Sequence, residues 1–562
     1  MRRVRPGEGE GEGEGEGEGG EHQGQDRRQV DRRQFLRQSG AALAAVAAAS
    51  VLGPTAAGAI GDVPRPGATG HGHPTTGPER PPDWKALRRS LAGSLVLPSD
   101  RNYAVAKLIY NERFDDIDPA AIAYCRTPGD VQRCVDFARR HGVLLAARSG
   151  GHSFGGYSSC PGLVVDTTSM AKVAVSPDGT RAVVGAGARL IDVYQALAAS
   201  GVLLPGGSCP TVGIAGLALG GGVGVLGRNY GLTCDQMTSI DLVTADGRLL
   251  TCDPEHHGDL YWASRGGGGG NFGVATSLTF RVHPIPPIAL FTLEWPWAAS
   301  ADGLAAWQRW VPSTPPALWS NCQLLSSAGA EGARATPKLR VTGVLCGSAT
   351  SLAAALQPLR SAVGGTPTYD FVGPEGYMDA MLIEAGCQGS TVAACHLPTQ
   401  DPAGTLSRST FAAKSAYLGA PMPDAGTAAV VDAVEALAQQ APQAGGGFVF
   451  DSYGGAINRM PAAATAFVHR HQLAGVQYSV TWSSGAPGSM PAVATAWLSQ
   501  SERALAPYTD GAYQNYVDPT LADWEHAYYG TNLARLVRVK RAVDPDDVFT
   551  FTQSIPLHLP RR

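Results

Sequence analysis

The hydrophobic positions between residues 122 and 282 change period several times, as they do where short strands alternate with helices. Apolar residues recur every three or four positions from Asp130 to His141, and Pro128-Gly129 before them is a helix start signal. The sequence therefore predicts an amphipathic helix over 130–141. The same region is predicted to contain strands at 163–166 and 181–185, a helix at 191–199, and a hairpin of strands 240–244 and 249–252 around the turn Asp246-Gly247.

From about residue 288 to 507 the pattern differs, because alanine- and leucine-rich helical stretches such as 428–441 alternate with strands. In the segment 476–482 the even-numbered residues are apolar and the odd-numbered residues are polar. Alternate side chains of a strand share a face, so one face is predicted to pack on helices and the other to present polar groups to a cleft. A solvated sheet face is the alternative. A second strand at 448–453 places Val449, Asp451 and Tyr453 on one face in the same way.

The N-terminal region follows neither pattern. Residues 7–19 are an almost strict Gly-Glu alternation that cannot build a core, so this segment is predicted to be disordered. The pair Arg32-Arg33 precedes an apolar, alanine-rich stretch at 41–52 and a small-residue site near Ala59. This order predicts a twin-arginine signal peptide at 1–59 and secretion through the twin-arginine export machinery, with a short membrane-anchoring helix as the alternative. Residues 60–99 are expected to form a linker or N-terminal extension.

Composition and charge narrow the possible partners. The chain has 562 residues and a net charge of −4 at pH 7, and no basic cluster lies outside the signal, so nucleic acid is excluded as a partner. About 480 residues follow the signal and the Gly/Pro/His-rich stretch at 61–82, which favours two domains. No later segment has the length and apolarity of a membrane anchor.

The ten cysteines are scattered without a C-x-x-C pair or a zinc-like spacing, so no metal site is expected. Cys387 and Cys395 are near enough in sequence to pair in an oxidising compartment, although spacing alone does not decide it. Cys125, Cys134 and Cys160 are predicted to be buried thiols.

Two glycine-rich loops each carry one nucleophilic side chain. Arg148-Ser-Gly-Gly-His152-Ser-Phe-Gly-Gly156 follows the apolar run 143–147, and Gly206-Gly-Ser-Cys209-Pro-Thr-Val-Gly213 precedes the glycines at 220–222. Glycine lets the backbone approach a ligand closely with positive φ, so that its N–H groups cradle an anion such as a pyrophosphate. A nucleophile in each loop predicts a ligand that is held covalently.

These motifs resemble those of the berberine-bridge-enzyme-like FAD-linked oxidases, a branch of the vanillyl-alcohol-oxidase/p-cresol-methylhydroxylase superfamily. The resemblance implies that FAD is bound bicovalently, by an 8α-histidyl bond to His152 and a 6-S-cysteinyl bond to Cys209. It also implies an α+β fold, with an FAD-binding domain of two small α/β subdomains at 100–287. A substrate domain with an antiparallel sheet backed by helices would occupy 288–510, and a C-terminal segment at 511–562 would return to the FAD domain.

A second nucleotide-binding motif competes for the glycines of the second loop. Residues 222–227 fit the fingerprint G-x-G-x-x-G, but the preceding residues are too glycine-rich for the strand that a Rossmann site needs. The family resemblance instead places these glycines around FAD. Val212 stands where the family carries a residue that controls oxygen access, and a small valine there favours an oxidase. The flavin contacts that the resemblance implies are Arg148, Ser149, Gly150, Gly151, Ser153, Phe154, Pro210, Thr211, Val212, Gly213, Gly216, Gly220, Gly221, Gly222, Gly224, Asn271, Phe272, Val274, Tyr513 and Asn515.

The C-terminal stretch matches the closing segment of the family, which contains a Y-x-N-Y element, here Tyr513 to Tyr516. The resemblance implies that Tyr516 is the general base and that Asp451 is its partner, as in sugar-oxidising relatives; aromatic packing is the alternative for Tyr516. A free tyrosine has a pKa of about 10, so it needs a neighbour that takes its proton or stabilises the phenolate. Tyr453 and Gln477 are expected to line the substrate cleft.

These features predict a secreted FAD-linked oxidase that acts on a CH–OH group of a small molecule, a carbohydrate or a sugar-bearing metabolite. Hydride transfer to flavin N5 and reoxidation by O2 would give H2O2. Plant members that close rings often carry a glutamate on the substrate sheet, and Gly475 and Gln477 near that position count against cyclisation. Two alternatives stay open: a dehydrogenase with a quinone or protein acceptor, and a flavin-loaded binding protein without turnover.

Overall fold

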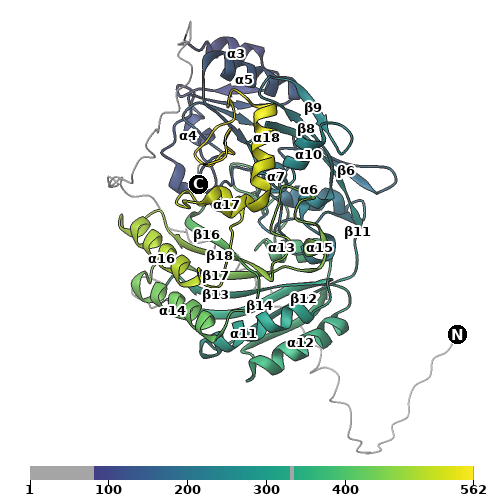
Figure 1. The fold of residues 1–562 in the computed structure, drawn as a ribbon, viewed down its shortest axis with the longest axis vertical. Coiled ribbons are helices and arrows are strands. Elements are labelled where there is room, and N and C mark those ends of the chain that lie inside the picture. Colours follow the sequence, from purple (N-terminus) through teal and green to yellow (C-terminus); the bar gives the residue numbers. More distant parts are fainter. Residues whose placement is uncertain (1–80, 330–334, 561–562) are drawn as a thin grey trace, which may run out of the picture.

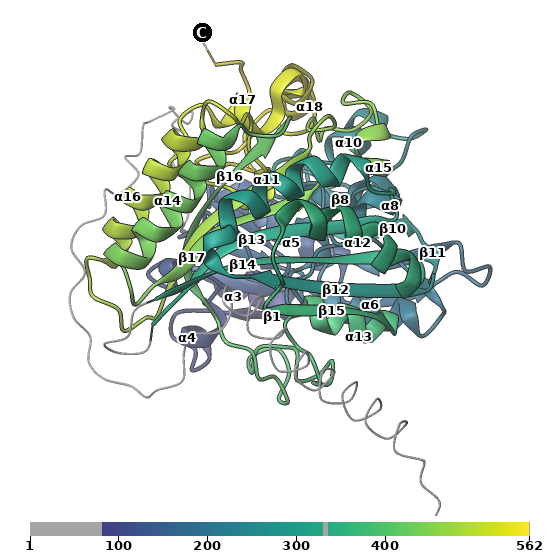
Figure 2. The same cartoon turned by 90° about the horizontal axis from the view of Figure 1, so that it is seen from below.

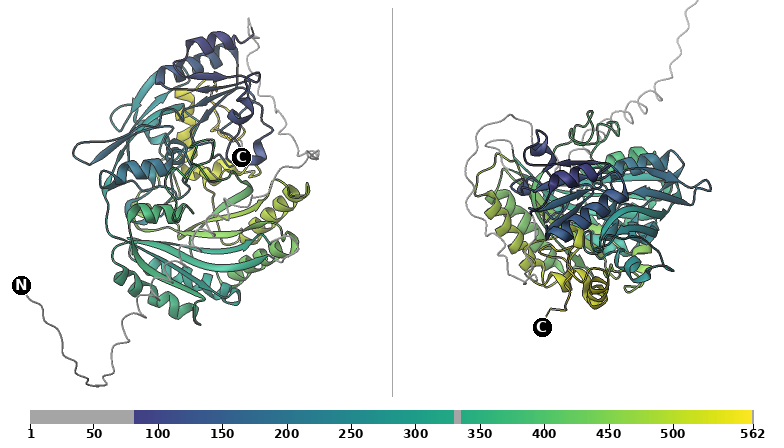
Figure 3. Two further views of the ribbon diagram at one scale, coloured as in Figure 1. Left: turned by 180° about the vertical axis from the view of Figure 1, so that it is seen from behind. Right: turned by 90° about the horizontal axis from the view of Figure 1, so that it is seen from above.

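The computed structural model describes residues 81–329 and 335–560. The predicted Gly-Glu segment and twin-arginine signal lie outside these residues. The described chain forms two stacked layers, the upper built mainly from residues before 288 and the lower from a large sheet with helices beneath it (Figure 1). The C-terminal helices return to the upper layer, beside strands from early in the chain (Figure 3).

A small sheet with helices forms the first unit of the upper layer. Its elements are α3 (Trp84–Ser90), β1 (Ser94–Val96), α4 (Tyr103–Ala106), η2 (Glu112–Phe114), β2 (Ala121–Tyr124), α5 (Pro128–His141), β3 (Leu145–Arg148) and β4 (Leu163–Asp166). The strand order is β1-β2-β4-β3, with β2, β4 and β3 parallel and β1 antiparallel to β2. The predicted helix over 130–141 is confirmed as α5; it begins at Pro128 because the Thr127 side chain caps its first turn.

Part of the segment 60–99, predicted as a linker or N-terminal extension, contains regular elements. Residues 84–96 form α3 and β1, and β1 pairs with β2. The Asp130 carboxylate of α5 holds this segment in place, because it accepts hydrogen bonds from the backbone N–H groups of Ala92 (2.7 Å) and Gly93 (3.2 Å). Elements this short carry too few residues for a hydrophobic period to show in the sequence.

An antiparallel five-stranded sheet forms the second unit, with the order β5-β6-β10-β8-β9. Its strands are β5 (Val173–Val175), β6 (Arg181–Gly185), β8 (Met237–Val243), β9 (Leu249–Cys252) and β10 (Val274–Arg281). The pairing of β8 with β9 confirms the predicted hairpin, and α6 (Leu190–Ala198) confirms the predicted helix to within one residue. This unit also contains β7 (Val202–Leu203), α7 (Ile214–Leu219), α8 (Gly227–Tyr230), α9 (Thr233–Gln236), α10 (Gly258–Ala263) and β11 (His283–Pro284).

The lower layer is a seven-stranded antiparallel sheet in the order β15-β12-β14-β13-β17-β18-β16. The strands are β12 (Ile288–Trp295), β13 (Leu318–Ser327), β14 (Thr336–Cys346), β15 (Tyr369–Glu375), β16 (Thr410–Leu418), β17 (Gly445–Ser452) and β18 (Ala474–Trp482). Four long helices cover its lower face, as Figure 2 shows: α11 (Ser300–Trp310), α12 (Ala349–Val363), α14 (Asp424–Gln440) and α16 (Met490–Leu505). The shorter helices are η3 (Trp297–Ala299), η4 (Val311–Ser313), α13 (Tyr377–Glu384) and α15 (Gly455–Arg459).

The two faces of this sheet differ as the alternation in 476–482 predicts. Val476, Tyr478 and Val480 belong to the apolar core shared with α11, α14 and α16. The intervening positions, including Gln477, face the upper layer, and so does Asp451, whose neighbours Phe448 and Phe450 are in the lower core. The predicted fold, two small FAD-binding units above a large antiparallel sheet backed by helices, is confirmed.

The C-terminal segment carries η5 (Gln514–Tyr516), α17 (Trp524–Tyr529), η6 (Gly530–Asn532) and α18 (Leu533–Val543). α18 packs on α10 of the upper layer. Within the described residues, no helix combines the length and the apolarity that a membrane span needs.

Two of the ten cysteines form a disulfide, and the other eight are free thiols. Cys387 and Cys395 form a disulfide. Cys125 and Cys134 are buried, as predicted, but Cys160, in the loop before β4, is only half-buried.

Candidate active site

The two nucleophile-bearing loops meet through their glycines. A Cβ on Gly150 would lie 2.2 Å from the backbone nitrogen of Gly213, and a Cβ on Gly213 would lie 2.0 Å from the Ser149 hydroxyl. Only glycine permits backbones to approach this closely. The contact brings the loop of His152 against the loop of Cys209, although neither loop is near the other in sequence.

Two contacts hold the ring of His152, one at a ring nitrogen and one at a ring face. Its Nε2 lies 2.8 Å from the hydroxyl oxygen of Thr211, and its ring stacks on Tyr110 with 4.0 Å between centroids. Burial, with a further contribution from Arg189, lowers the pKa of His152 to about 3. The imidazole is therefore neutral, and its Nδ1 makes no hydrogen bond within the part of the chain that the structure describes.

Cys209 lies beside the same threonine. Burial raises the pKa of the Cys209 thiol to about 11, and hydrogen bonds from Thr211 and from the Val212 backbone oppose that rise. Thr211 itself is almost fully buried. One residue therefore contacts both predicted attachment side chains.

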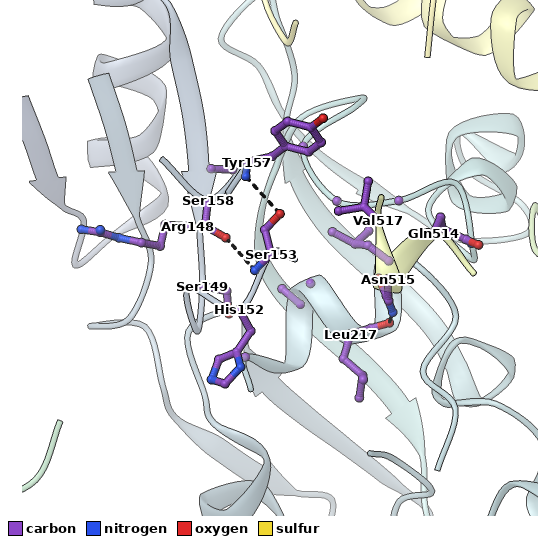
Figure 4. A pocket seen from close by; sticks show the side chains of 18 of the residues that line it. Arg148, Ser149, His152, Ser153, Tyr157, Ser158, Leu217, Gln514, Asn515 and Val517 are labelled. Carbon is purple, nitrogen blue, oxygen red and sulfur yellow. Dashed lines mark hydrogen bonds between the residues drawn. The ribbon is translucent and has the colours of Figure 1, made fainter. Parts of the chain in front are cut away.

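A pocket extends from these loops between β3, α7 and the C-terminal segment (Figure 4). His152 and Ser153 lie on one side of it, and Gln514 and Asn515 lie opposite. The predicted contacts that line this pocket are Arg148, Ser149, Gly150, Gly151, His152, Ser153, Phe154, Val212, Gly213, Gly216, Asn271, Val274 and Asn515. Arg148 also pairs with Asp166, with 2.6 Å between Nε and the carboxylate oxygen, so it serves the fold as well.

The lining of the pocket fits a flavin dinucleotide. Gly151, Gly268 and Gly270 have positive φ, and among the described residues no atom beyond the chain neighbours and helix backbone of Gly216 lies within 4 Å of a Cβ built there. The glycines thus leave open space and exposed backbone where side chains would otherwise fill the pocket. Such a cradle of backbone N–H groups suits a pyrophosphate.

Other predicted contacts lie just behind the pocket wall. A Cβ on Gly220 would lie 1.9 Å from the side-chain oxygen of Asn515, and one on Gly224 would lie 1.7 Å from a backbone oxygen. These glycines make close packing contacts in this structure, and their predicted contact with the cofactor stays a prediction. The other predicted contacts that do not line the pocket are Pro210, Thr211, Gly221, Gly222, Phe272 and Tyr513.

The Y-x-N-Y element fastens the C-terminal segment to the glycine loop. The Tyr513 hydroxyl accepts a hydrogen bond from the Gly222 backbone N–H (2.9 Å). The Asn515 amide donates to the Leu217 carbonyl (2.9 Å) and to the Tyr513 hydroxyl (2.8 Å). Gln514 donates to the Gly220 carbonyl (2.7 Å). Tyr513 and Asn515 therefore position the loop that borders the pocket.

Tyr516 stands at the junction of two cavities. It lines the large pocket and also a small cavity that contains Asp451 and Tyr453. Its ring stacks on Phe154, with 5.0 Å between centroids. Burial and the nearby Asp451 carboxyl raise the pKa of Tyr516 well above its usual value. The structure thus brings together the two residues that the sequence proposes for proton transfer.

Asp451 is held by the sheet. It lies opposite Asn321 of β13 in the strand register, and a hydrogen bond with Asn321 partly offsets the effect of burial. Burial raises the pKa of Asp451 to about 7. The carboxyl therefore changes protonation state near neutrality, which suits a group that accepts a proton during turnover.

Tyr453 and Gln477 occupy different rows of the sheet. Tyr453 lines the small cavity, where its ring lies over Gly475; a Cβ on Gly475 would meet the ring at 3.0 Å. Gln477 pairs with Val449 in the next row and does not line that cavity. A side chain at position 475 would therefore require the Tyr453 ring to shift.

Comparisons with known proteins agree with this arrangement. Residues 119–253 match the FAD binding domain family, and residues 512–556 match the berberine and berberine-like family. The uncharacterized FAD-linked oxidoreductase YgaK of Bacillus subtilis is 32% identical over 477 residues, which cover 84% of this chain and 98% of that protein. The chain belongs to the berberine-bridge-enzyme-like family of FAD-linked oxidoreductases.

Solved structures of this family superpose over most of the chain. The BBE-like 1 protein of Physcomitrella patens has a TM-score of 0.76 and 31% identity, covering 85% of this chain and 99% of that one. The xylooligosaccharide oxidase of Myceliophthora thermophila, solved with xylobiose, has a TM-score of 0.72 and 27% identity, covering 84% and 98%. FAD is therefore the cofactor of this berberine-bridge-enzyme-like chain.

Sequence reasoning missed several residues of this site. Tyr110, which stacks on His152, lies in a segment without periodicity or motif, so nothing in the sequence marks it. Gln514 is the variable position of the Y-x-N-Y element, yet it binds the glycine loop. The pocket is also lined by Tyr157, Tyr528, Tyr529, Phe551 and Gln553, which come together only when the C-terminal segment folds back.

Proposed function

We propose that this protein is an exported oxidase that carries FAD on both His152 and Cys209 and oxidises a CH–OH group of a carbohydrate or a sugar-bearing metabolite. The observation that carries the proposal is the position of Tyr516. It lines the flavin pocket and also the small cavity that contains Asp451. This position, between the pocket and a second titratable group, supports the role of Tyr516 as the proton acceptor.

The attachment chemistry is supported by the state of the two nucleophiles. A neutral His152 with a free Nδ1 has the lone pair that a bond to the flavin requires. Cys209 must first lose its proton, and the hydrogen bonds from Thr211 and Val212 favour its thiolate. Thr211 contacts both side chains, and His152 lines the pocket.

The proton chemistry follows from the raised pKa of Tyr516, which keeps this residue protonated at neutral pH. It can take a substrate proton only while its own proton moves to a neighbour, and the Asp451 carboxylate is that neighbour. Bound FAD would supply the hydride acceptor, with O2 as the final electron acceptor and H2O2 as its product. Val212 in the pocket wall supports O2 as the acceptor, because a small side chain leaves room beside the flavin.

The sugar assignment is supported by relatives and by the sheet. Xylooligosaccharide oxidase and chitooligosaccharide oxidase share the fold at 27% identity each. A row of polar side chains crosses the flavin-facing side of the sheet in register: Thr292, Thr342, Asn321 and Asp451. Hydroxyl-rich ligands need such a surface because each hydroxyl group both donates and accepts hydrogen bonds.

The test begins with the purified mature protein. Flavin that stays with the polypeptide after acid precipitation, on peptides containing His152 and Cys209, supports bicovalent attachment. Substrates are then screened by H2O2 release, with Tyr516→Phe as the matched variant. We expect at least a 100-fold loss of flavin reduction in Tyr516→Phe at unchanged flavin content, since general base catalysis contributes about 10²–10⁴-fold.

Each alternative function gives its own result in that test. Flavin reduction by a sugar without oxygen uptake, and with rapid transfer to a quinone, would identify a dehydrogenase. Sugar binding without flavin reduction would identify a binding protein. Unchanged reduction rates in Tyr516→Phe would assign the base to another residue. Flavin that is released by acid would remove the covalent attachment from the proposal.

A further inference from the structure

The small cavity beside the flavin pocket lies on the path that the proposed proton transfer must take. Its lining includes Tyr516 and Asp451, and both residues keep part of their surface exposed. Within the described residues, no hydrogen bond joins the Tyr516 hydroxyl to the Asp451 carboxylate. A proton passes between two groups along a direct hydrogen bond or through one water. The transfer therefore calls for a bridging group between these two side chains.

The size of the cavity matches one water molecule. Its volume, taken as the space open to the centre of a water molecule, is about 10 Å³. A buried site needs roughly 10–15 Å³ by this measure to hold a single water. A sugar ring is much larger than this, so the cavity is too small to be a subsite for a sugar.

The cavity wall offers hydrogen bonds on several sides. Its polar lining residues are Ser415, Tyr417, Asp451, Tyr453, Tyr513 and Tyr516, and the others are Val223, Ala416, Gly475 and Val476. A buried water makes about two to four hydrogen bonds, whereas an apolar cavity stays dry. A wall in which hydroxyl groups and a carboxyl predominate is therefore suited to an ordered water.

Two tyrosines set the direction of the hydrogen bonds in this cavity. The Tyr453 hydroxyl donates to the Tyr417 hydroxyl (3.4 Å), and in the part of the chain that the structure describes neither hydroxyl makes another hydrogen bond. The Tyr453 oxygen can therefore still accept a hydrogen bond, and the Tyr417 hydroxyl still has a proton to donate. The Tyr453 ring rests on Gly475, where a Cβ would lie 3.0 Å from it. A water, with two protons and two lone pairs, can bind both hydroxyl groups and still contact Tyr516 and Asp451.

We propose that the small cavity holds one water molecule that carries the proton from Tyr516 to Asp451, and that Tyr453 is the positioning residue for this water. The inference rests on the proposed function, because it describes how the proton of that reaction leaves Tyr516. Only protons move along this path. The substrate hydroxyl gives its proton to the Tyr516 oxygen, Tyr516 gives its own proton to the water, and the water gives one of its protons to the Asp451 carboxylate. The electron pair left on the substrate oxygen forms the C=O bond as the hydride leaves the same carbon.

The test compares two variants of the flavin-loaded enzyme with one control. Tyr453→Phe removes the hydroxyl and keeps the ring on Gly475. Val223→Ile extends an apolar lining side chain by one carbon atom, to displace the water while every polar side chain stays in place. The control is Tyr377→Phe on α13, because Tyr377 is buried outside the cavity and its hydroxyl has no partner among the described residues.

Two kinds of measurement are made on each protein. Anaerobic flavin reduction by xylobiose, cellobiose and glucose gives kcat and KM. Crystal structures of the flavin-loaded wild type and of both cavity variants show what the cavity contains. The crystal structures report on the water independently of turnover, and the flavin content shows whether each variant is folded.

We expect one ordered water in the wild-type crystal, within about 2.5–3.2 Å of the Tyr516 Oη and of an Asp451 carboxylate oxygen. Tyr453→Phe should lower kcat about tenfold, the effect of one lost hydrogen bond, with KM within about twofold. Val223→Ile should lack the water and lower kcat at least as much. Tyr377→Phe should match the wild type.

Three results would overturn the water relay alone. One is a direct hydrogen bond between Tyr516 and Asp451 in the wild-type crystal, without a water between them. Another is a kcat in both cavity variants equal to that of the wild type. The third is a raised KM at unchanged kcat in Tyr453→Phe, which would place Tyr453 in the substrate site instead. Failure of the proposed function is distinct, because the wild type itself would then show no flavin reduction with any of the three sugars, and the relay would fall with it.

Discussion

Thr211 connects the two proposed attachment residues, because its hydroxyl lies 2.8 Å from the His152 Nε2 and it also hydrogen-bonds the Cys209 sulfur. Thr211→Val keeps the shape and removes the hydroxyl, so we expect less flavin bound at both sites. Thr211→Ser keeps the hydroxyl, so this variant should retain most of the bound flavin. Peptide mass spectrometry after acid precipitation measures each bond. Full double attachment in Thr211→Val would contradict this role.

Asp451 gives the reaction a predicted pH dependence. Its pKa is raised to about 7, so the carboxyl is protonated below that pH and unable to accept a proton. We expect kcat/KM for flavin reduction to rise about tenfold per pH unit below pH 7 and then to level off. The measurement is anaerobic stopped-flow between pH 5 and 9.

Asp451→Asn is the matched variant for this pH profile. It should lower kcat/KM about 100-fold and remove the inflection near pH 7. A wild-type profile that is flat over this range, or an inflection that survives in Asp451→Asn, would show that another group accepts the proton.

At the scale of elements, Asp130 holds the segment between α3 and β1 to α5. It is fully buried and accepts hydrogen bonds from the backbone N–H groups of Ala92, Gly93, Arg126 and Thr127. Asp130→Ala leaves these donors unpaired, so we expect the free energy of unfolding to fall by about 3 kcal/mol. Chemical denaturation followed by circular dichroism measures this loss.

The control for Asp130 lies on the same helix. Asp136 forms a surface pair with Arg139, and both side chains are more than 40% exposed. Asp136→Ala should therefore cost less than about 1 kcal/mol. Equal losses in the two variants would mean that Asp130 adds no more than a surface charge does.

At the scale of the whole molecule, a buried ion pair joins the two layers. Arg470, in the chain before β18, is fully buried and binds Asp235 of α9 through two hydrogen bonds of 2.8 and 2.7 Å. Asp235→Ala leaves an uncompensated buried charge. We expect a loss of about 3–5 kcal/mol in the free energy of unfolding.

An exposed pair provides the comparison for Asp235. Arg535 and Asp259 are 37% and 74% exposed, so Asp259→Ala should change the free energy of unfolding by less than about 1 kcal/mol. Unfolding is followed by flavin fluorescence and circular dichroism together. If Asp235→Ala lowered the free energy of unfolding no more than Asp259→Ala does, the packing of the two layers would not depend on the Arg470–Asp235 pair.

The sequence by itself determined the local features of this protein. The period of 130–141, the alternation in 476–482 and the turn Asp246-Gly247 depend on neighbours a few residues away, and α5, β18 and the β8–β9 hairpin follow them. The two glycine-rich loops and the Y-x-N-Y element identified the cofactor because each motif is a short run of consecutive residues.

Only the tertiary structure decided which side chains meet. Tyr516 reaches Asp451 because the C-terminal segment folds back over the sheet, and Tyr110 reaches His152 from a segment without any pattern. α3 and β1 are too short for a period and exist because Asp130 of α5 holds them. Glu384 looks ordinary in the sequence, and its raised pKa comes from burial and from a carboxyl 67 positions away. Long-range packing sets these properties, and no local pattern encodes it.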